Sequence, residues 1–138
     1  MIDTVVVDSS AIIAVLRDEP DAAVLKSILD GSSNSLCSLV TFVESFMVMT
    51  GQNVGAPPEL HQEFLASLGI ALAPLSGAQA TTAAEAFLRF GKGRHPAKLN
   101  LGDCFSYALA KSLNAPLLYK SGDFSQTDIV SATAGVHP

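Results

Sequence analysis

The spacing of apolar and polar residues along the chain predicts short strands that alternate with helices. Residues 5–7 are three valines in a row, a pattern typical of a strand buried on both faces of a parallel sheet. Asp8 ends this run, and a pair of serines before an apolar helical pattern follows it. Further strands are expected at residues 35–38, 70–75 and 116–119, with a short edge strand at residues 129–130.

Apolar residues three or four positions apart predict helices between these strands. The helices are expected at residues 11–16, 20–30, 40–52, 58–68, 77–90 and 101–113. Alternating strands and helices favour an α/β fold, here a three-layer α/β/α arrangement with a mainly parallel central sheet. Because no linker or repeat interrupts the pattern, residues 1–138 are expected to form a single domain. The helix at 40–52 is apolar around most of its circumference, which indicates burial on more than one side.

The composition indicates the partners and the cellular compartment to be expected. The chain is 49% hydrophobic and has a formal net charge of -5, so a polyanionic partner would require a local basic patch. Cys37 and Cys104 are far apart, without the spacing of a zinc site or the density of a disulfide scaffold, which suits a reducing cytoplasm. No basic segment precedes the first strand, and the most apolar helix is too short to span a bilayer. A cytoplasmic protein with no membrane partner is expected.

Four carboxylates stand where a charge is costly, each beside or within an apolar element: Asp8, Glu44, Asp103 and Asp123. Taken singly, Asp103 could serve the helix dipole, Asp123 a turn and Glu44 an exposed helix face. Three of the four belong at strand ends or helix starts and can meet at one edge of the sheet. Clustered carboxylates repel one another unless a cation neutralises them, and oxygen ligands point to Mg²⁺ or Mn²⁺ and to phosphoryl transfer.

The segments around these acids resemble the four sequence blocks of PIN-domain ribonucleases, and most closely those of VapC toxins from type II toxin–antitoxin systems. The matching segments are Val-Val-Val-Asp-Ser-Ser-Ala-Ile at 5–12, Thr41-x-x-Glu44, residues 100–111 and residues 117–129. The resemblance implies an endoribonuclease that uses Mg²⁺ or Mn²⁺, held by Asp8, Glu44, Asp103 and Asp123 as metal-binding and catalytic residues. It also implies a homodimer, an RNA substrate and a cognate VapB-like antitoxin.

One segment departs from the family pattern. The family often has Lys-Gly-x-Asp-Phe before its last block, whereas this chain has Lys-Ser-Gly-Asp-Phe at 120–124. The loop around Asp123 can therefore differ, and Asp128 is a candidate neighbouring or substitute ligand. Ser9, next to Asp8, is a candidate supporting residue.

A basic segment is the main candidate for RNA contact. Arg89, Lys92, Arg94 and Lys98 make up half of the eight basic residues, and no acid stands among them. The alternative is an ordinary solvated loop. His95 lies in the same segment and is expected to contact RNA or solvent, and no second histidine stands at metal-ligand spacing. His61 and His137 are expected at the surface.

Two other functions fit part of the pattern. Haloacid-dehalogenase-like phosphatases also place an Asp after the first strand, but they have a second Asp two residues later, where this chain has Ser10. An inactive PIN-like RNA-binding module would keep the fold and lose the chemistry, although all four acids are present here. A metal titration with a generic RNA substrate separates binding from cleavage.

Overall fold

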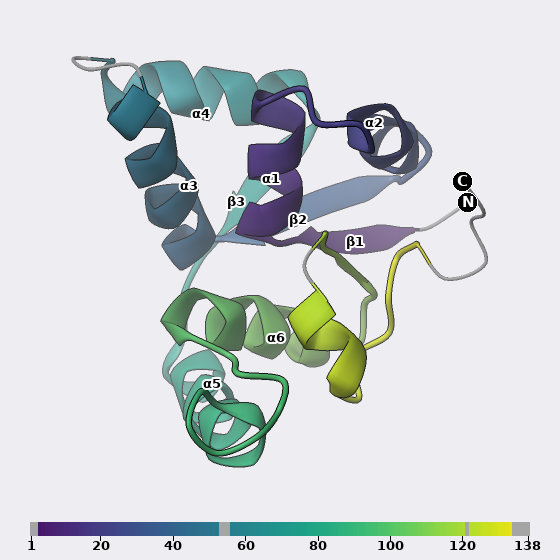
Figure 1. Ribbon diagram of the computed structural model, residues 1–138. Coiled ribbons are helices and arrows are strands. Elements are labelled where there is room, and N and C mark those ends of the chain that lie inside the picture. Colours follow the sequence, from purple (N-terminus) through teal and green to yellow (C-terminus); the bar gives the residue numbers. More distant parts are fainter. Residues whose placement is uncertain (1–2, 53–55, 121, 134–138) are drawn as a thin grey trace.

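The computed structural model describes residues 3–52, 56–120 and 122–133, which form a central parallel sheet with helices on both faces (Figure 1). The sheet has the order β3-β2-β1-β4. Its strands are β1 (Thr4–Val7), β2 (Asn34–Ser38), β3 (Ile70–Ala73) and β4 (Leu117–Leu118). The helices are α1 (Ser9–Leu16), α2 (Ala22–Asp30), α3 (Leu39–Gln52), α4 (Pro58–Ser67), α5 (Gly77–Phe90) and α6 (Leu101–Leu113), with a short 3-10 helix η1 (Gly122–Gln126).

The three valines of β1 connect the two layers of the core. Val5 and Val7 belong to the cluster under α1 and α2, whereas Val6 belongs to the cluster against α5 and α6, since successive side chains point to opposite faces. All three are at most 1% exposed. In Figure 1, α1, α2 and α4 lie above the sheet and α5 and α6 below it. The predicted three-layer α/β/α fold with a parallel sheet is confirmed.

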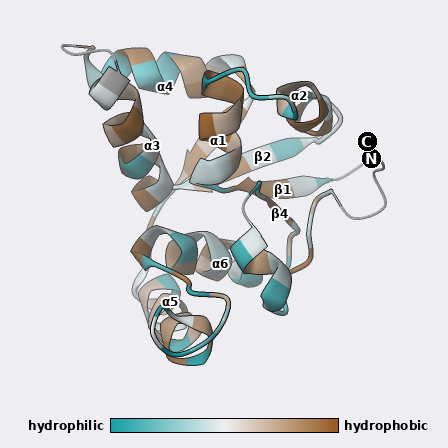
Figure 2. Ribbon diagram, viewed as in Figure 1, coloured by the Kyte–Doolittle hydropathy of each residue, from teal (hydrophilic) through white to brown (hydrophobic). Residues whose placement is uncertain are grey.

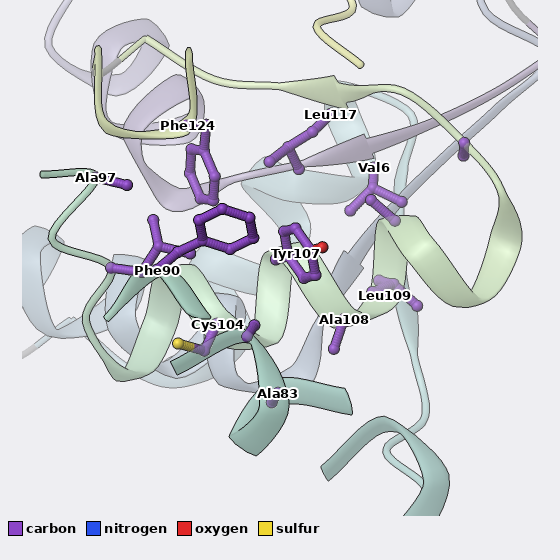
Figure 3. Close-up of a cluster of buried hydrophobic side chains, with 14 of the residues drawn as sticks. Val6, Ala83, Phe90, Ala97, Cys104, Tyr107, Ala108, Leu109, Leu117 and Phe124 are labelled. Atoms are coloured by element: carbon purple, nitrogen blue, oxygen red, sulfur yellow. The ribbon is translucent and has the colours of Figure 1, made fainter. Parts of the chain in front are cut away.

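Aromatic rings fill the lower core, between α6, α5 and η1. Figure 3 shows Phe124 pointing toward Phe90 and the Tyr107 ring beside Phe90, and the Phe90 and Tyr107 ring centroids are 5.8 Å apart. Phe124 is fully buried and Tyr107 is nearly so. This packing fixes α6, which carries Asp103, and the segment that carries Asp123.

The helix α3 contacts α1, α4 and α6, and so reaches both layers. Met49 is buried, as the apolar circumference predicted, but Val43 and Met47 are 51% and 65% exposed. Figure 2 shows brown, apolar residues along much of α3, including its outer side. The helix therefore presents an apolar surface to solvent next to Glu44.

The expectation of a surface position for His61 was wrong. Its side chain is fully buried in α4, with ring centroids 5.5–6.1 Å from those of Phe42, Phe46 and Phe64. The polar ring is accommodated because His61 Nε2 is 2.7 Å from Ser45 Oγ on α3. Burial lowers the pKa of His61. His137 lies outside the described residues.

Several element bounds differ from the prediction for local reasons. The second helix begins at Ala22 and not at residue 20, because a turn joins Ala22 N to the Glu19 carbonyl. β3 ends at Ala73 because Pro74 has no N–H to donate to a sheet. Residues 129–130 form no strand, although Ser131 makes an isolated bridge to Leu117. None of the described helices has the length and apolar character needed to cross a membrane.

Candidate active site

The beginnings of α1, α3 and α6 meet beside the carboxyl end of β1 (Figure 1). Asp8 follows β1 and is the N-cap of α1, Glu44 lies in the second turn of α3, and Asp103 lies in the first turn of α6. Parallel strands place their carboxyl ends at one edge, so residues far apart in sequence converge there. The structure brings these three predicted carboxylates together.

Asp8 is held by hydrogen bonds to both oxygens of its carboxylate. Oδ2 accepts from the backbone N–H and the hydroxyl of Ser10, at 3.0 and 2.7 Å. Oδ1 accepts from the hydroxyl of Ser106 on α6, at 2.7 Å. The Ser106 and Thr41 hydroxyl oxygens lie 3.2 Å apart, and both residues are fully buried. Asp8 is 1% exposed, so its orientation is set by α1, α3 and α6 together.

Glu44 is fixed by Ser9 and by the absence of a side chain at Gly102. The Ser9 hydroxyl donates to Glu44 Oε1 at 2.6 Å. A Cβ atom at Gly102 would lie 2.3 Å from Glu44 Oε2, closer than real atoms approach. Burial raises the pKa of Glu44, the Ser9 hydrogen bond opposes the rise, and the Asp8 charge adds to it.

Asp103 combines a structural bond with a crowded electrostatic setting. It forms a capping box with Asn100, in which each side chain accepts from the other residue's backbone N–H. Burial raises the pKa of Asp103 to about 7, against the Asn100 hydrogen bond and helped by the charges of Asp8, Glu44 and Asp123. The charges of the other three carboxylates thus all act on Asp103 at this edge of the sheet.

Asp123 and Asp128 take different places. Asp123 is half-buried in η1, and its charge acts on Asp103. Asp128 accepts from the Tyr107 hydroxyl at 2.6 Å and lies 3.0 Å from Lys111 Nζ and 3.8 Å from Arg89 Nη1. These contacts stabilise its charged form, and the pKa of Asp128 is lowered even though its partial burial acts in the opposite direction. The structure brings Asp123, and not Asp128, to the carboxylate cluster.

The cluster suits a hard divalent cation by its chemistry. Its ligand atoms are carboxylate oxygens, which Mg²⁺ and Mn²⁺ prefer, and its excess negative charge is what a cation would neutralise. Within the described ranges, no three Asp, Glu, His or Cys side chains already enclose a position for a metal ion. The residues therefore fit such an ion by type and charge, in an open arrangement.

The basic segment divides between two places. Lys92, Arg94 and Lys98 line one open hollow of about 520 Å³, together with His95. Arg89 lies in a different hollow, beside Asp128 and Lys111.

Four residues that hold the carboxylates or contact them were not predicted as site residues: Ser10, Thr41, Gly102 and Ser106. Ser106 stands three positions after Asp103, which places both on the same face of α6, and this spacing could have pointed to it. Nothing in the sequence shows that Gly102 faces Glu44, because that contact depends on how α3 crosses α6.

The model of the PIN domain family matches residues 5–130. The chain belongs to the PIN domain family. Two relatives agree with this assignment in more detail. Ribonuclease VapC42 of Mycobacterium tuberculosis is 41% identical over 125 residues, covering 90% of this chain and 95% of its own. Ribonuclease VapC of Mycolicibacterium smegmatis is 40% identical over 129 residues, covering 91% and 98%. This PIN-domain chain is a VapC ribonuclease, a hydrolase that acts on RNA.

Solved structures with low sequence identity share the fold. The Mycobacterium tuberculosis toxin VapC20, described as cleaving the sarcin–ricin loop, superposes with a TM-score of 0.72 at 16% identity, covering 97% of this chain and 99% of its own. A chain of a toxin–antitoxin complex from Klebsiella pneumoniae gives a TM-score of 0.67 at 18% identity, covering 93% and 97%. PIN-domain architecture thus persists where sequence similarity is low.

Proposed function

We propose that this VapC ribonuclease is an endoribonuclease dependent on Mg²⁺ or Mn²⁺, with Asp8, Glu44, Asp103 and Asp123 as its metal-binding and catalytic residues. The observation that supports this most directly is the convergence of Asp8, Glu44 and Asp103 from the beginnings of α1, α3 and α6, where the charge of Asp123 also acts on Asp103. When bound, the ion would activate water and offset the charge that develops at the scissile phosphate.

The residues of the chain prepare this chemistry by fixing carboxylate positions before substrate binds. Ser10 and Ser106 hold both oxygens of Asp8, so little reorganisation is needed when a cation arrives. Ser9 holds one oxygen of Glu44 and leaves the other at the beginning of α6. The positive end of the α6 dipole favours negative charge at this place.

A direct test measures cleavage of a generic single-stranded RNA with Mg²⁺, with Mn²⁺ and with a chelator. The wild type should cut internally with either metal and stop with the chelator, and D8N and D103N should each lose cleavage while remaining folded. D30N, at an exposed position on α2, is the matched control and should cut like the wild type. Chelator-insensitive cleavage, or activity retained in D8N, would contradict the proposal.

The same proposal includes a toxin role, with neutralisation by a VapB-like antitoxin, and assembly as a homodimer. Two apolar hollows lie next to the site, and Leu101, 73% exposed, lines both. One of them also contains Glu44, Val43 and Met47. An apolar antitoxin segment in this hollow could send an arginine to the carboxylates and displace the cation. An adaptable methionine suits a partner that folds on binding.

Leu101 offers a clean test of these partner contacts. L101D places an acid in the first turn of α6, where the helix tolerates it well, so the fold should persist. We expect light scattering to report a wild-type dimer, and L101D to weaken both the dimer and the inhibition of cleavage by the cognate small protein. V130D, at an exposed position away from both hollows, should change neither property. A wild-type monomer that the small protein does not inhibit would refute this part.

A further inference from the structure

Two backbone hydrogen bonds join the two ends of the segment between α5 and α6. Lys92 N donates to the Leu99 carbonyl at 3.0 Å, and Leu99 N donates to the Phe90 carbonyl at 2.9 Å. Ala97 and Leu99 are fully buried and anchor the segment in the lower core. Lys98 has a φ of 55°, in the left-handed region that few non-glycine residues adopt, which indicates that its surroundings impose one backbone shape. The loop at residues 91–98 is thus a built structure.

His95 has a defined tautomer within this loop. Its Nδ1 lies 3.0 Å from Ala97 N, and a backbone N–H can only donate, so Nδ1 accepts. The proton of the neutral imidazole therefore sits on Nε2. The ring also packs edge-on against Phe90, with centroids 5.1 Å apart. In the described part of the chain no group accepts a hydrogen bond from Nε2, which leaves a positioned donor.

Three cations share the hollow that His95 lines. Lys92, Arg94 and Lys98 line its wall, and no acidic residue does. None of the three forms a salt bridge with a carboxylate of residues 3–52, 56–120 or 122–133. Arg89 is different because the carboxylate of Asp128 faces it, whereas the guanidinium of Arg94 lies over the Phe87 ring, 5.7 Å from its centroid. Positive charge without a protein counter-ion is therefore concentrated in the loop at residues 91–98.

We propose that this loop is a phosphate-binding bowl that takes one phosphodiester group of the RNA away from the bond that is cut. His95 Nε2–H supplies a directed hydrogen bond, and Lys92, Arg94 and Lys98 supply charge. The proposal rests on the proposed ribonuclease function. It adds an anchor that holds RNA against the repulsion of the carboxylate cluster, because only Leu99 and Asn100 separate the loop from α6. The bowl would therefore set which bond reaches Asp103.

Two substitutions of His95 distinguish the loss of the Nε2 donor from the loss of the hydrogen bond that holds the loop. H95N places Oδ1 near the position of Nδ1, keeps the bond from Ala97 N and removes the Nε2 donor. H95Q instead places its terminal amide near Nε2 and removes the acceptor for Ala97. If the imidazole donates to phosphate, H95N should weaken RNA binding while its melting temperature stays near that of the wild type. Wild-type RNA affinity in H95N would remove His95 from the site.

The charge of the bowl is tested by fluorescence anisotropy with a short labelled single-stranded RNA in chelator, across a salt series. K92Q, R94Q and K98Q should each weaken binding, and the triple variant should lower the salt slope by about 0.7, the value for one lost phosphate on a single strand. K26Q, exposed on α2, removes the same charge and should bind like the wild type. A slope loss near 2 in the triple variant, as expected for three separate phosphates, would overturn the single bowl.

Two further readouts distinguish the ways in which the proposal can fail. Loop variants that bind RNA like the wild type, in a protein whose wild type still cuts RNA with Mg²⁺, would overturn the bowl and leave the ribonuclease function intact. Inorganic phosphate at equal ionic strength should displace RNA no better than chloride does. Displacement at low phosphate concentration that is equally strong in the triple variant would place the phosphate-sensitive RNA contact outside the bowl and overturn the proposal.

Discussion

At the scale of single residues, the site depends on hydroxyl groups that hold carboxylates. Ser106 on α6 donates a hydrogen bond to Asp8 at the beginning of α1. The Thr41 hydroxyl on α3 lies against the Ser106 hydroxyl. Removing a group that orients a metal-binding residue typically lowers metal affinity or activity by about 10- to 100-fold. Ser106 is therefore a positioning residue whose loss should be felt in the chemistry before it is felt in the fold.

The prediction for S106A is a loss of cleavage of about 10- to 100-fold. One buried hydrogen bond disappears, so the free energy of unfolding should fall by about 1 kcal/mol. Because Asp8 becomes less well oriented, higher Mg²⁺ should restore part of the rate. S112A, on the same helix with its hydroxyl bonded only to the Leu109 carbonyl, is the control and should cleave normally. Undiminished cleavage in S106A across the Mg²⁺ series would refute the role.

The raised pKa of Asp103 predicts that the stability of the metal-free protein depends on pH. Its pKa rises on folding from the ordinary 3.8 to about 7, so the folded state holds the proton more tightly than the unfolded state. The contribution of Asp103 to the unfolding free energy should accordingly be highest below pH 3.8 and fall as the pH rises from 3.8 to about 7. The difference in melting temperature between the wild type and D103N, measured in chelator, should show that decline. A D103N profile parallel to that of the wild type would exclude Asp103 as its source.

At the scale of elements, α3 and α4 are joined by a buried polar pair within a group of phenylalanines. Ser45 Oγ lies 2.8 Å from the Thr41 carbonyl and 2.7 Å from His61 Nε2, while His61 Nδ1 is buried without a hydrogen-bond partner. The ring is easier to bury neutral than charged, which is why the pKa of His61 is lowered.

The prediction for this pair is a loss of stability at acidic pH. The unfolded state takes up a proton near pH 6.5 and the folded state only at lower pH, so the contribution of His61 to stability falls as pH decreases below 6.5. H61F removes both the titration and the unpartnered nitrogen, and Ser45 keeps its bond to the Thr41 carbonyl. The difference in melting temperature between H61F and the wild type should therefore grow in favour of H61F on acidification. A constant difference would show that His61 does not titrate on unfolding.

Elements differ in how far their sequence predicted them. The last two long helices, α5 and α6, appear with the predicted bounds, because Ser76 and Asn100 cap them and their apolar stripes are regular. His61 was misplaced because a histidine in a polar helix carries no local sign of burial, and its environment comes from α3. The carboxylates were singled out as candidates because an acid beside an apolar run stands out. Gly102 and Ser106 were not, since their importance depends on contacts between distant elements.

At the scale of the whole molecule, charge is divided. The chain has a net charge of -5, with carboxylates gathered at the carboxyl edge of the sheet and unpaired cations in the loop before α6. An RNA strand would meet attraction at the loop and repulsion at the carboxylates. A bound cation would reverse that repulsion locally, so metal and RNA should assist each other's binding. The sequence predicted both charge clusters, but only the fold separates Arg89 from the loop cations.

The close approach of Gly102 to Glu44 has a genetic consequence. A Cβ atom at Gly102 meets the end of a flexible side chain, which can swing away, whereas a Cβ atom at Gly91 would lie 2.3 Å from the backbone carbonyl of Phe87, which cannot. If expression of the chain arrests growth, surviving colonies should include substitutions at both glycines. Immunoblots should find the Gly102 survivors at nearly normal abundance and the Gly91 survivors depleted. Equal depletion of both groups of survivors would mean that Gly102 is required for folding. Normal abundance of the Gly102 survivors would mean that a substitution at this one codon inactivates the toxin while the protein still accumulates in the cell.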